Sequence, residues 1–356
     1  MSFITGLMLV DAPASALNNA GAQEGGRTDN LVAVKVIRTR QGVFPYVSAQ
    51  AVRYWLRSTL ERKFSEWQHS PIWQEKKVAY TDAEPMTYWD DDLLGYMRAQ
   101  GKSSDAIASR EGTTLTEITT TVTRVSPMRV STLVSIAPGA PTDDFGTMSR
   151  HAGNPVPFEH QFYRTVLKGL FSLNLSAAGT FSYEQRTGFL NLDEVRKDKA
   201  EEMGLEHLED EKAYRLPIDQ RQQRVATLLR GLATLEGGAN QTLHYTDVSP
   251  SFLIATVTAG GNHPFAHCIG AASSGLPKLN LEALAEVLTV FGDQIQSPIY
   301  FGWAKGFMDE ERAAFDDWLD DGGAAWKGNI IVDHPRVCLT KLAETVESAA
   351  ATEWFA

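Results

Sequence analysis

The stretch SAQAVRYWLRSTL, residues 48–60, decides how this part of the chain folds. Its core-forming side chains recur at i, i+3, i+4, i+7 and i+8, which is the spacing of one face of an α-helix. These side chains are Val52, Trp55, Leu56, Thr59 and Leu60. Ser48 precedes them as an N-cap, and Gln50, Arg53 and Arg57 form a second, polar stripe. The pattern predicts a helix that buries one face against a core.

Strands and a second helix surround this first helix in the sequence. The segments typical of strands are residues 2–11, 119–136, 164–183 and 251–258. A second helix begins at Pro217 and ends at Gly237. Residues 65–120 look like an insertion, and residues 138–161 form a long loop that is rich in Gly, Pro, Asp and His. Without these insertions the order is β-α-β-β-α-β, so the sequence predicts an α+β protein with a ferredoxin-like order, which RNA-recognition motifs share.

Charge is unevenly distributed along the 356-residue chain, whose formal net charge is −11. Residues 27–63 carry a net charge of +6, whereas residues 193–212 carry −5 and residues 309–321 carry −6. A net negative charge argues against a nucleic-acid partner, because phosphate binding needs a basic surface. The uneven distribution leaves two interpretations open. It is either ordinary surface patchiness, or one basic RNA-facing surface with acidic surfaces turned to solvent or to a neighbouring subunit.

Several features indicate the compartment. No apolar run approaches the ~20 residues needed to cross a bilayer, and residues 1–10 are too short and lack the basic leader of a signal peptide. Cys268 and Cys338 have neither metal-ligand spacing nor the spacing of a disulfide framework. We therefore expect a cytoplasmic protein with no membrane partner.

Motifs that would indicate an enzyme are missing from the sequence: it contains no G-x-S-x-G, H-E-x-x-H, P-loop or C-x-x-C. The run Asp90, Asp91 and Asp92 could hold a divalent cation, but acids at the start of a helix are the simpler interpretation. Asp143 and Asp144 could be catalytic, although turn chemistry explains them as well. We predict no catalytic residue, no metal site and no cofactor.

Two features could bind phosphate. The turn Gly237, Gly238, Ala239, Asn240 and Gln241 could present backbone N–H groups to an anion, but a glycine helix stop explains it equally well. Arg53 and Arg57 could clamp phosphates from the first helix. Two arginines on a polar helix face are also ordinary surface residues, so both interpretations stay open.

Five blocks of the sequence together resemble a known family. They are RTD at 27–29, PYVSAQAVRYWLR at 45–57, DDDLLGYM at 90–97, RVSPMRVS at 124–131 and GGANQ at 237–241. In this order they resemble the CRISPR Cascade backbone family, the seventh Cas protein, in its DevR-type autoregulator branch, which is associated with type I-B and related systems. The resemblance covers about residues 3–260.

The resemblance implies a division of the chain. A ferredoxin-like or RRM-like palm would comprise residues 1–64, 121–137 and 162–260. A helical fingers insertion would be residues 65–120, and a protruding thumb loop residues 138–161. Residues 261–356 would form a C-terminal helical extension.

The resemblance also implies a function without catalysis. Copies of the chain would polymerise as a filament along a guide RNA (crRNA), whose exposed bases pair with target DNA in antiviral defence or other RNA-guided targeting. The protein would contact phosphate and sugar, because the guide sequence varies and base pairing supplies specificity. Other Cascade subunits would be partners: a guide-end cap, a large subunit, a small subunit and a guide-processing nuclease.

Site residues follow from the matched blocks. The expected RNA-binding residues are Arg27, Ser48, Gln50, Arg53, Arg57, Arg129, Gly237, Gly238, Asn240 and Gln241. Phe145 and Met148 are expected as the thumb's apolar wedge, which would displace a base of the guide. Two alternatives remain: a metal-dependent ribonuclease of the related type III kind, using Asp29 or the Asp143–Asp144 pair, and a DNA-binding autoregulator, for which no helix-turn-helix pattern is visible.

Overall fold

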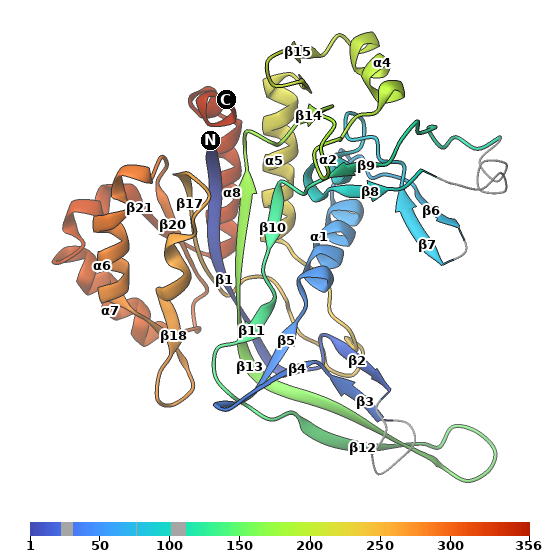
Figure 1. The fold of residues 1–356 in the computed structure, drawn as a ribbon. Helices are drawn as coiled ribbons and strands as arrows, with labels where there is room; N and C mark the ends of the chain where they lie inside the picture. Colours follow the sequence, from blue (N-terminus) through green and yellow to red (C-terminus); the bar gives the residue numbers. More distant parts are fainter. Residues whose placement is uncertain (23–30, 76, 101–111) are drawn as a thin grey trace.

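The computed structural model describes residues 1–22, 31–75, 77–100 and 112–356 (Figure 1). Arg27 and Asp29 lie outside the described residues. One large mixed sheet dominates the fold, with the strand order β21-β20-β17-β1-β13-β11-β5-β4. These strands are β1 (Ser2–Ser15), β4 (Val36–Thr39), β5 (Gly42–Val47), β11 (Leu133–Ser135), β13 (Val156–Asn174), β17 (Phe252–Ala259), β20 (Ile299–Trp303) and β21 (Ile330–Asp333). Four more strands belong to this sheet outside that order: β3 (Leu31–Val34), β10 (Met128–Val130) and β12 (Thr142–Met148) pair with β13, and β2 (Asn19–Ala22) pairs with β3.

The remaining elements cover this sheet or extend from it. The helices of the described residues are α1 (Ala49–Lys63), α2 (Trp89–Leu94), α4 (Glu194–Glu202), α5 (Ile218–Ala233), α6 (Leu281–Val290), α7 (Asp309–Asp320) and α8 (Pro335–Glu347). The short strands are β6 (Ile72–Glu75), β7 (Val78–Thr81), β8 (Tyr96–Arg98), β9 (Val122–Arg124), β14 (Thr180–Ser182), β15 (Glu206–Leu208), β16 (Ala213–Arg215), β18 (Ile269–Ala271) and β19 (Pro277–Leu279). The described residues also contain the 3-10 helices η1 (Pro264–His267), η2 (Gly292–Gln294), η3 (Ala324–Asn329) and η4 (Ala349–Phe355). None of the described helices is both long and apolar enough to span a membrane.

The central strand β1 explains why the sheet is buried on both sides. It pairs antiparallel with β13 and with β17, and its first nine residues are buried. Successive side chains of a strand point to opposite faces. Ile4 and Met8 therefore pack in one core cluster with α1, α5 and α8, whereas Leu7 and Leu9 pack in a second cluster with α6 and α7. The predicted α+β class is confirmed, and the predicted β-α-β-β-α-β order corresponds to β1, α1, β10, β13, α5 and β17.

Four expectations about individual segments were wrong. The predicted loop at 138–161 contains a β-hairpin, in which β12 pairs with the start of β13 from Thr142–Phe162 to Met148–Val156. The predicted strand at 119–136 is three short strands, β9, β10 and β11. The described part of 65–120 holds one short helix, α2, beside β6, β7 and β8, so it is not mainly helical. The C-terminal hundred residues are not only helical either, because β20 and β21 extend the main sheet.

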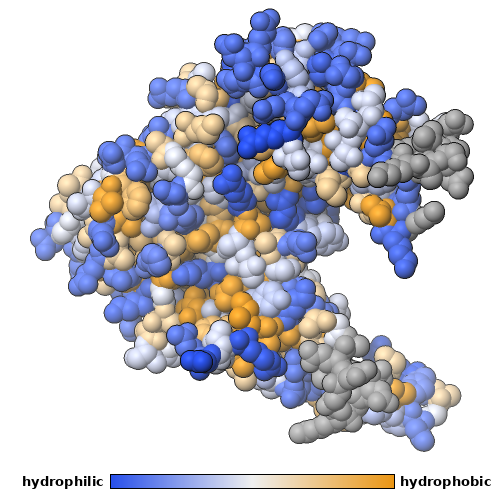
Figure 2. Space-filling model, viewed as in Figure 1, coloured by the Kyte–Doolittle hydropathy of each residue, from blue (hydrophilic) through white to orange (hydrophobic). Residues whose placement is uncertain are grey.

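Two parts of the chain protrude from the main sheet and give the molecule an open, C-shaped outline (Figures 1 and 2). The part that carries β6, β7, β8 and β9 is called the lobe. The hairpin of β12 and residues 156–161 of β13 is called the arm. The arm extends away from the sheet, and a hollow separates it from the lobe, with α1 between the two (Figures 1 and 2). Helix α1 packs on α5 where Gly231 leaves room, since a Cβ there would lie 2.4 Å from Leu60 Cδ2.

A close approach between β20 and α8 gives a first prediction. A Cβ on Gly302 would lie 2.5 Å from Pro335 Cα, which is backbone and cannot rotate away. We expect Gly302→Ala to lower the free energy of unfolding by about 1–3 kcal/mol, the usual cost of overpacking, as measured by urea denaturation. Gly270→Ala is the matched control, because nothing lies within 4 Å of its Cβ position. Equal stability of the two variants would contradict the close approach.

Candidate nucleic-acid interface

Helix α1 forms as the sequence predicts. Ser48 is its N-cap, with Oγ accepting a hydrogen bond from the Ala51 N–H at 3.4 Å. The five residues of the predicted core stripe are all buried. Gln50 and Tyr54 are exposed on the opposite side, so the helix presents a polar and aromatic face outside the core.

The glycine turn after α5 lies against the start of α1. Gly237 packs on the Trp55 ring, where a Cβ would lie 2.3 Å from Cγ. Gly238 has a φ of +102°, a conformation that L side chains rarely adopt. Gln241 Nε2 donates a hydrogen bond to the Gly237 carbonyl and closes the turn. The glycines are therefore required both by backbone conformation and by contact with α1.

Residues 17–19 join these two parts, and sequence reasoning did not select them. The Asn18 Oδ1 atom accepts the Ser48 N–H at 2.9 Å, and the Asn19 Oδ1 atom accepts the Asn240 side-chain amide at 3.2 Å. The Leu17 carbonyl accepts the Ala239 N–H at 3.0 Å. Residues 17–19, Ser48 and residues 237–241 are together called the junction. It brings together Ser48, Gly237, Gly238, Asn240 and Gln241 from the predicted site.

The arm is attached to the junction through rings and amides. The His244 ring lies 5.0 Å from the His160 ring and 5.1 Å from the Phe162 ring, centroid to centroid. Burial, and next the proximity of His160, hold the pKa of His244 below its ordinary value. Gln161 Oε1 accepts the Val34 N–H at 3.2 Å, and the next residue, Lys35, donates its N–H to the Asn18 carbonyl at 3.0 Å. The arm and the junction are thus one connected unit.

The predicted phosphate clamp of Arg53 and Arg57 is half-buried rather than free on a polar face. The Arg53 guanidinium donates to Ser126 Oγ and the Met128 carbonyl, both at 3.0 Å, and also to the Leu94 carbonyl. Arg57 faces Asp90, with 3.4 Å between Nε and Oδ2, and its side chain is 28% exposed. Arg53 therefore holds α1 to the lobe and β10, whereas Arg57 keeps part of its surface for solvent.

Arg129 is separated from the other predicted site residues. It lies on β10 next to Met128, which is buried in the core cluster that contains α1. Since neighbouring side chains of a strand point to opposite faces, Arg129 points away from α1. Its guanidinium lies 5.9 Å from the centroid of the Phe3 ring.

The two residues of the predicted wedge lie on the arm but do not share a face. Phe145 and Met148 are 59% and 60% exposed. They are three residues apart on β12, so their side chains point to opposite faces of the hairpin.

The aspartate pair at 143–144 lies on the same strand. Asp143 accepts a hydrogen bond from Gln161 at 2.8 Å, and Asp144 lies 3.3 Å from His160. This aspartate pair thus helps to hold the hairpin together.

Ion pairs neutralise part of the basic block at 27–63. Arg62 and Lys63 both pair with Glu236, at 3.5 Å and 2.5 Å. Arg38 and Arg40 are exposed and form no ion pair with any described residue. Within the described part of this basic block, exposed positive charge without an ion pair therefore lies on β4 and the turn after it.

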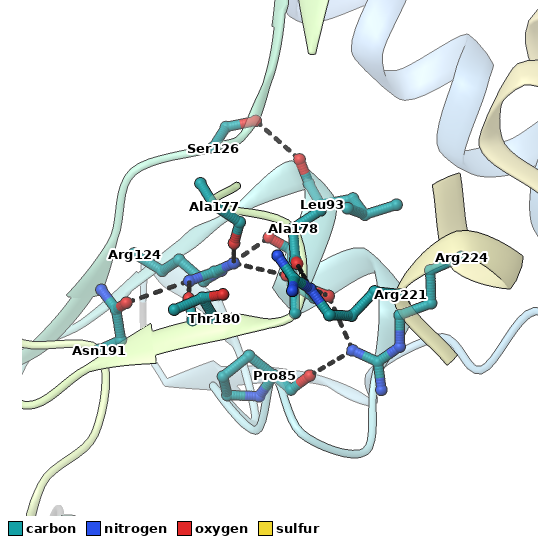
Figure 3. A network of polar contacts seen from close by, with 12 residues as sticks. Pro85, Leu93, Arg124, Ser126, Ala177, Ala178, Thr180, Asn191, Arg221 and Arg224 are labelled. Carbon is teal, nitrogen blue, oxygen red and sulfur yellow. Dashed lines mark hydrogen bonds and ion pairs between the residues drawn. The ribbon is translucent and has the colours of Figure 1, made fainter. Parts of the chain in front are cut away.

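The three aspartates at the start of α2 are buried rather than displayed to a metal or solvent. They do lie in the first turn, as predicted. Asp92 pairs with Arg124 at 2.5 Å and with Arg224 at 2.8 Å, and it also accepts the Gly179 N–H at 3.1 Å. Arg124 additionally donates to the Ala177 and Thr180 carbonyls and to Asn191, which ties the network together (Figure 3). Within the described residues no group of three or more His, Cys, Asp or Glu could hold a metal ion.

Known proteins resemble this chain in sequence and in fold. No protein-family model matches it. It is 26% identical over 167 residues to the CRISPR-associated protein Cas7/Cst2/DevR of Myxococcus xanthus (strain DK1622). The match covers 42% of this chain and 51% of that protein, so the chain spans about half the length of the curated relative.

Two solved chains also resemble it. One, from a "CRISPR RNA-guided surveillance complex, pre-nicking", has a TM-score of 0.54 at 10% identity, and the likeness covers 97% of this chain and 100% of that one. Another, from a "CRISPR RNA-guided surveillance complex", has a TM-score of 0.48 at 11% identity and covers 96% and 99% of the two chains. The resemblance predicted from the sequence is thus confirmed, whereas its association with type I-B systems stays a prediction. This chain is similar to a Cas7/Cst2/DevR protein and shares the fold of the first solved chain.

Proposed function

We propose that this chain is the crRNA-binding backbone subunit of a type I CRISPR Cascade complex and acts without catalysis in the cytoplasm. Several copies would polymerise along the guide RNA and present its bases to target DNA, beside the other Cascade subunits. The observation that carries the proposal is the sequence similarity to the Cas7/Cst2/DevR protein. Fold alone would not suffice, because one fold hosts many functions.

The hollow between arm and lobe supports this proposal (Figure 2). A strand of RNA that passes through it would meet the exposed face of α1, the junction and the base of the arm. The junction offers the Ser48 hydroxyl group and the Asn240 side-chain amide, which are groups that bind sugar and phosphate without reading sequence. The Gln241 amide is engaged within the turn, with the Gly237 carbonyl and the Thr246 N–H. Two basic residues belong to the elements that meet here: Lys35, whose backbone N–H bonds to the Asn18 carbonyl, and Arg57 of α1, which keeps part of its surface exposed. Contacts of this kind suit a guide whose sequence changes from one complex to the next.

The direct test is purification of the tagged chain from a host that supplies its neighbouring genes and a repeat-spacer array. Sequencing of the co-purified RNA should give one guide RNA of uniform length. Native mass spectrometry should give several copies of the chain for each RNA. A monomer without RNA under these conditions would refute the proposal.

Removal of the charges of Lys35 and Arg57 should lower the salt dependence of RNA binding. We expect Lys35→Gln with Arg57→Gln to reduce the slope of log K against log salt by up to about 1.4, since each lost contact to a single strand contributes about 0.7. Fluorescence anisotropy of a labelled single-stranded RNA measures this slope. Lys278→Gln with Lys305→Gln, in the C-terminal region, is the control of equal charge. An unchanged slope in the first variant would exclude Lys35 and Arg57 as phosphate contacts.

A further inference from the structure

A groove beside the junction has the shape of a ligand site. It runs between the exposed face of α1 and the glycine turn, with a volume of about 870 Å³. This volume lies within the usual range of small-molecule sites. Its apolar lining comes from Leu17, Ala51, Trp55 and Ala239. Tyr54 also lines it, and this side chain is 67% exposed, so most of its surface is left uncovered by the described chain.

The formal charges beside the groove cancel. Two carboxylates, Glu61 and Glu236, are balanced by two cations, Arg62 and Lys63, which lie 3.5 Å and 2.5 Å from Glu236. A phosphate needs cations or N–H groups that are not already paired with carboxylates. The groove therefore suits a planar, uncharged group better than an anion, although the glycine turn beside it was predicted to bind phosphate.

We propose that this groove binds one unstacked nucleobase of a single-stranded RNA, with the base stacked on Tyr54. Aromatic side chains accept any base, because every base has a π face. Ser58, on the groove's edge, offers a hydroxyl group to the base. The inference rests on the proposed function, since it names a base subsite beside α1 and the junction, which the RNA would contact.

The stacking has a signature that separates it from phosphate binding. Tyr54→Ala should weaken binding of a labelled single-stranded RNA by roughly fivefold to a hundredfold, the range measured for base stacking. The salt slope should stay that of the wild type, because no phosphate contact is lost. Tyr54→Phe keeps the ring and should bind as the wild type does. Phe189→Ala removes another exposed aromatic side chain, on a different segment, and should have no effect.

A second probe tests the groove without any phosphate. The fluorescence of 2-aminopurine riboside, an uncharged nucleoside, should be quenched by the wild type and by Tyr54→Phe but not by Tyr54→Ala. Quenching without RNA binding would sustain the base site while refuting the proposed function. Normal RNA binding by Tyr54→Ala, or a loss accompanied by a lower salt slope, would overturn the base site. Absence of both RNA binding and quenching in the wild type would overturn both proposals.

Discussion

Asp92→Ala should lower the free energy of unfolding by about 3–5 kcal/mol, the cost of leaving a buried charge without its partner. The Asp92 carboxylate is completely buried and pairs with both Arg124 and Arg224. Alanine would leave two guanidinium groups with a buried positive charge, and the Gly179 N–H would lose its acceptor. Because the network joins α2 to α5 and to residues 177–180, we expect the lobe to detach first.

Urea denaturation followed by circular dichroism measures this loss. Asp317→Ala is the matched control, since Asp317 is exposed on α7 and forms no ion pair with a described residue. It should change stability by less than about 0.5 kcal/mol. If Asp92→Ala fails to fold, Asp92→Asn keeps an acceptor for Gly179 and should give a smaller but measurable loss. Wild-type stability in Asp92→Asn and Asp92→Ala together would contradict the buried network.

Features that depend on a few neighbouring residues could be predicted from the sequence. The core stripe of α1 and its Ser48 cap follow from spacing within one helix, and both are confirmed. The glycine turn could also be found, because Gly238 needs a positive φ that few other residues adopt. The Asp92 network could not, since its partners lie 32 and 132 residues away and meet only in the folded chain.

Segments without a one-sided core pattern were missed. Six of the seven residues of β12 are exposed, so no alternation of apolar and polar residues marks it as a strand. All five residues of β20 are buried, and a short apolar run of this kind does not distinguish a strand from a helix. Arg129 was grouped with Arg53 because both belong to matched blocks, but only the strand geometry shows that they face opposite sides of the sheet.

Asp91 precedes Asp92 in the sequence. Whereas loss of the Asp92 carboxylate should destabilise the folded protein, we expect replacement of the Asp91 carboxyl group to stabilise it. Its carboxyl group is buried without a cation beside it, and its Oδ1 atom has no hydrogen-bond partner among the described residues. Burial first, and then the charge of Asp90, raise the pKa of Asp91 to about 7. Burial also raises the pKa of Asp90 and the pKa of Glu84. The backbone N–H of Glu84 donates a hydrogen bond to the Asp91 carboxyl group at 2.9 Å. Between pH 3.8 and about pH 7, the folded protein therefore holds a proton on Asp91 that the unfolded chain releases.

The sign of the pH dependence follows from this raised pKa. Its contribution to stability is fully present below the unfolded value of 3.8 and is lost as the pH rises through about 7. Asp91→Asn stays neutral and keeps an oxygen for the Glu84 N–H, so it should lose less stability over this window. The free energy of unfolding of Asp91→Asn, minus that of the wild type, should therefore rise by up to about 4 kcal/mol between pH 4 and pH 8, because each pKa unit corresponds to about 1.4 kcal/mol. Urea denaturation at intervals of pH, with Asp317→Asn as the exposed control, measures the difference. A constant difference between Asp91→Asn and the wild type across this range would mean that Asp91 is already ionised in the folded protein.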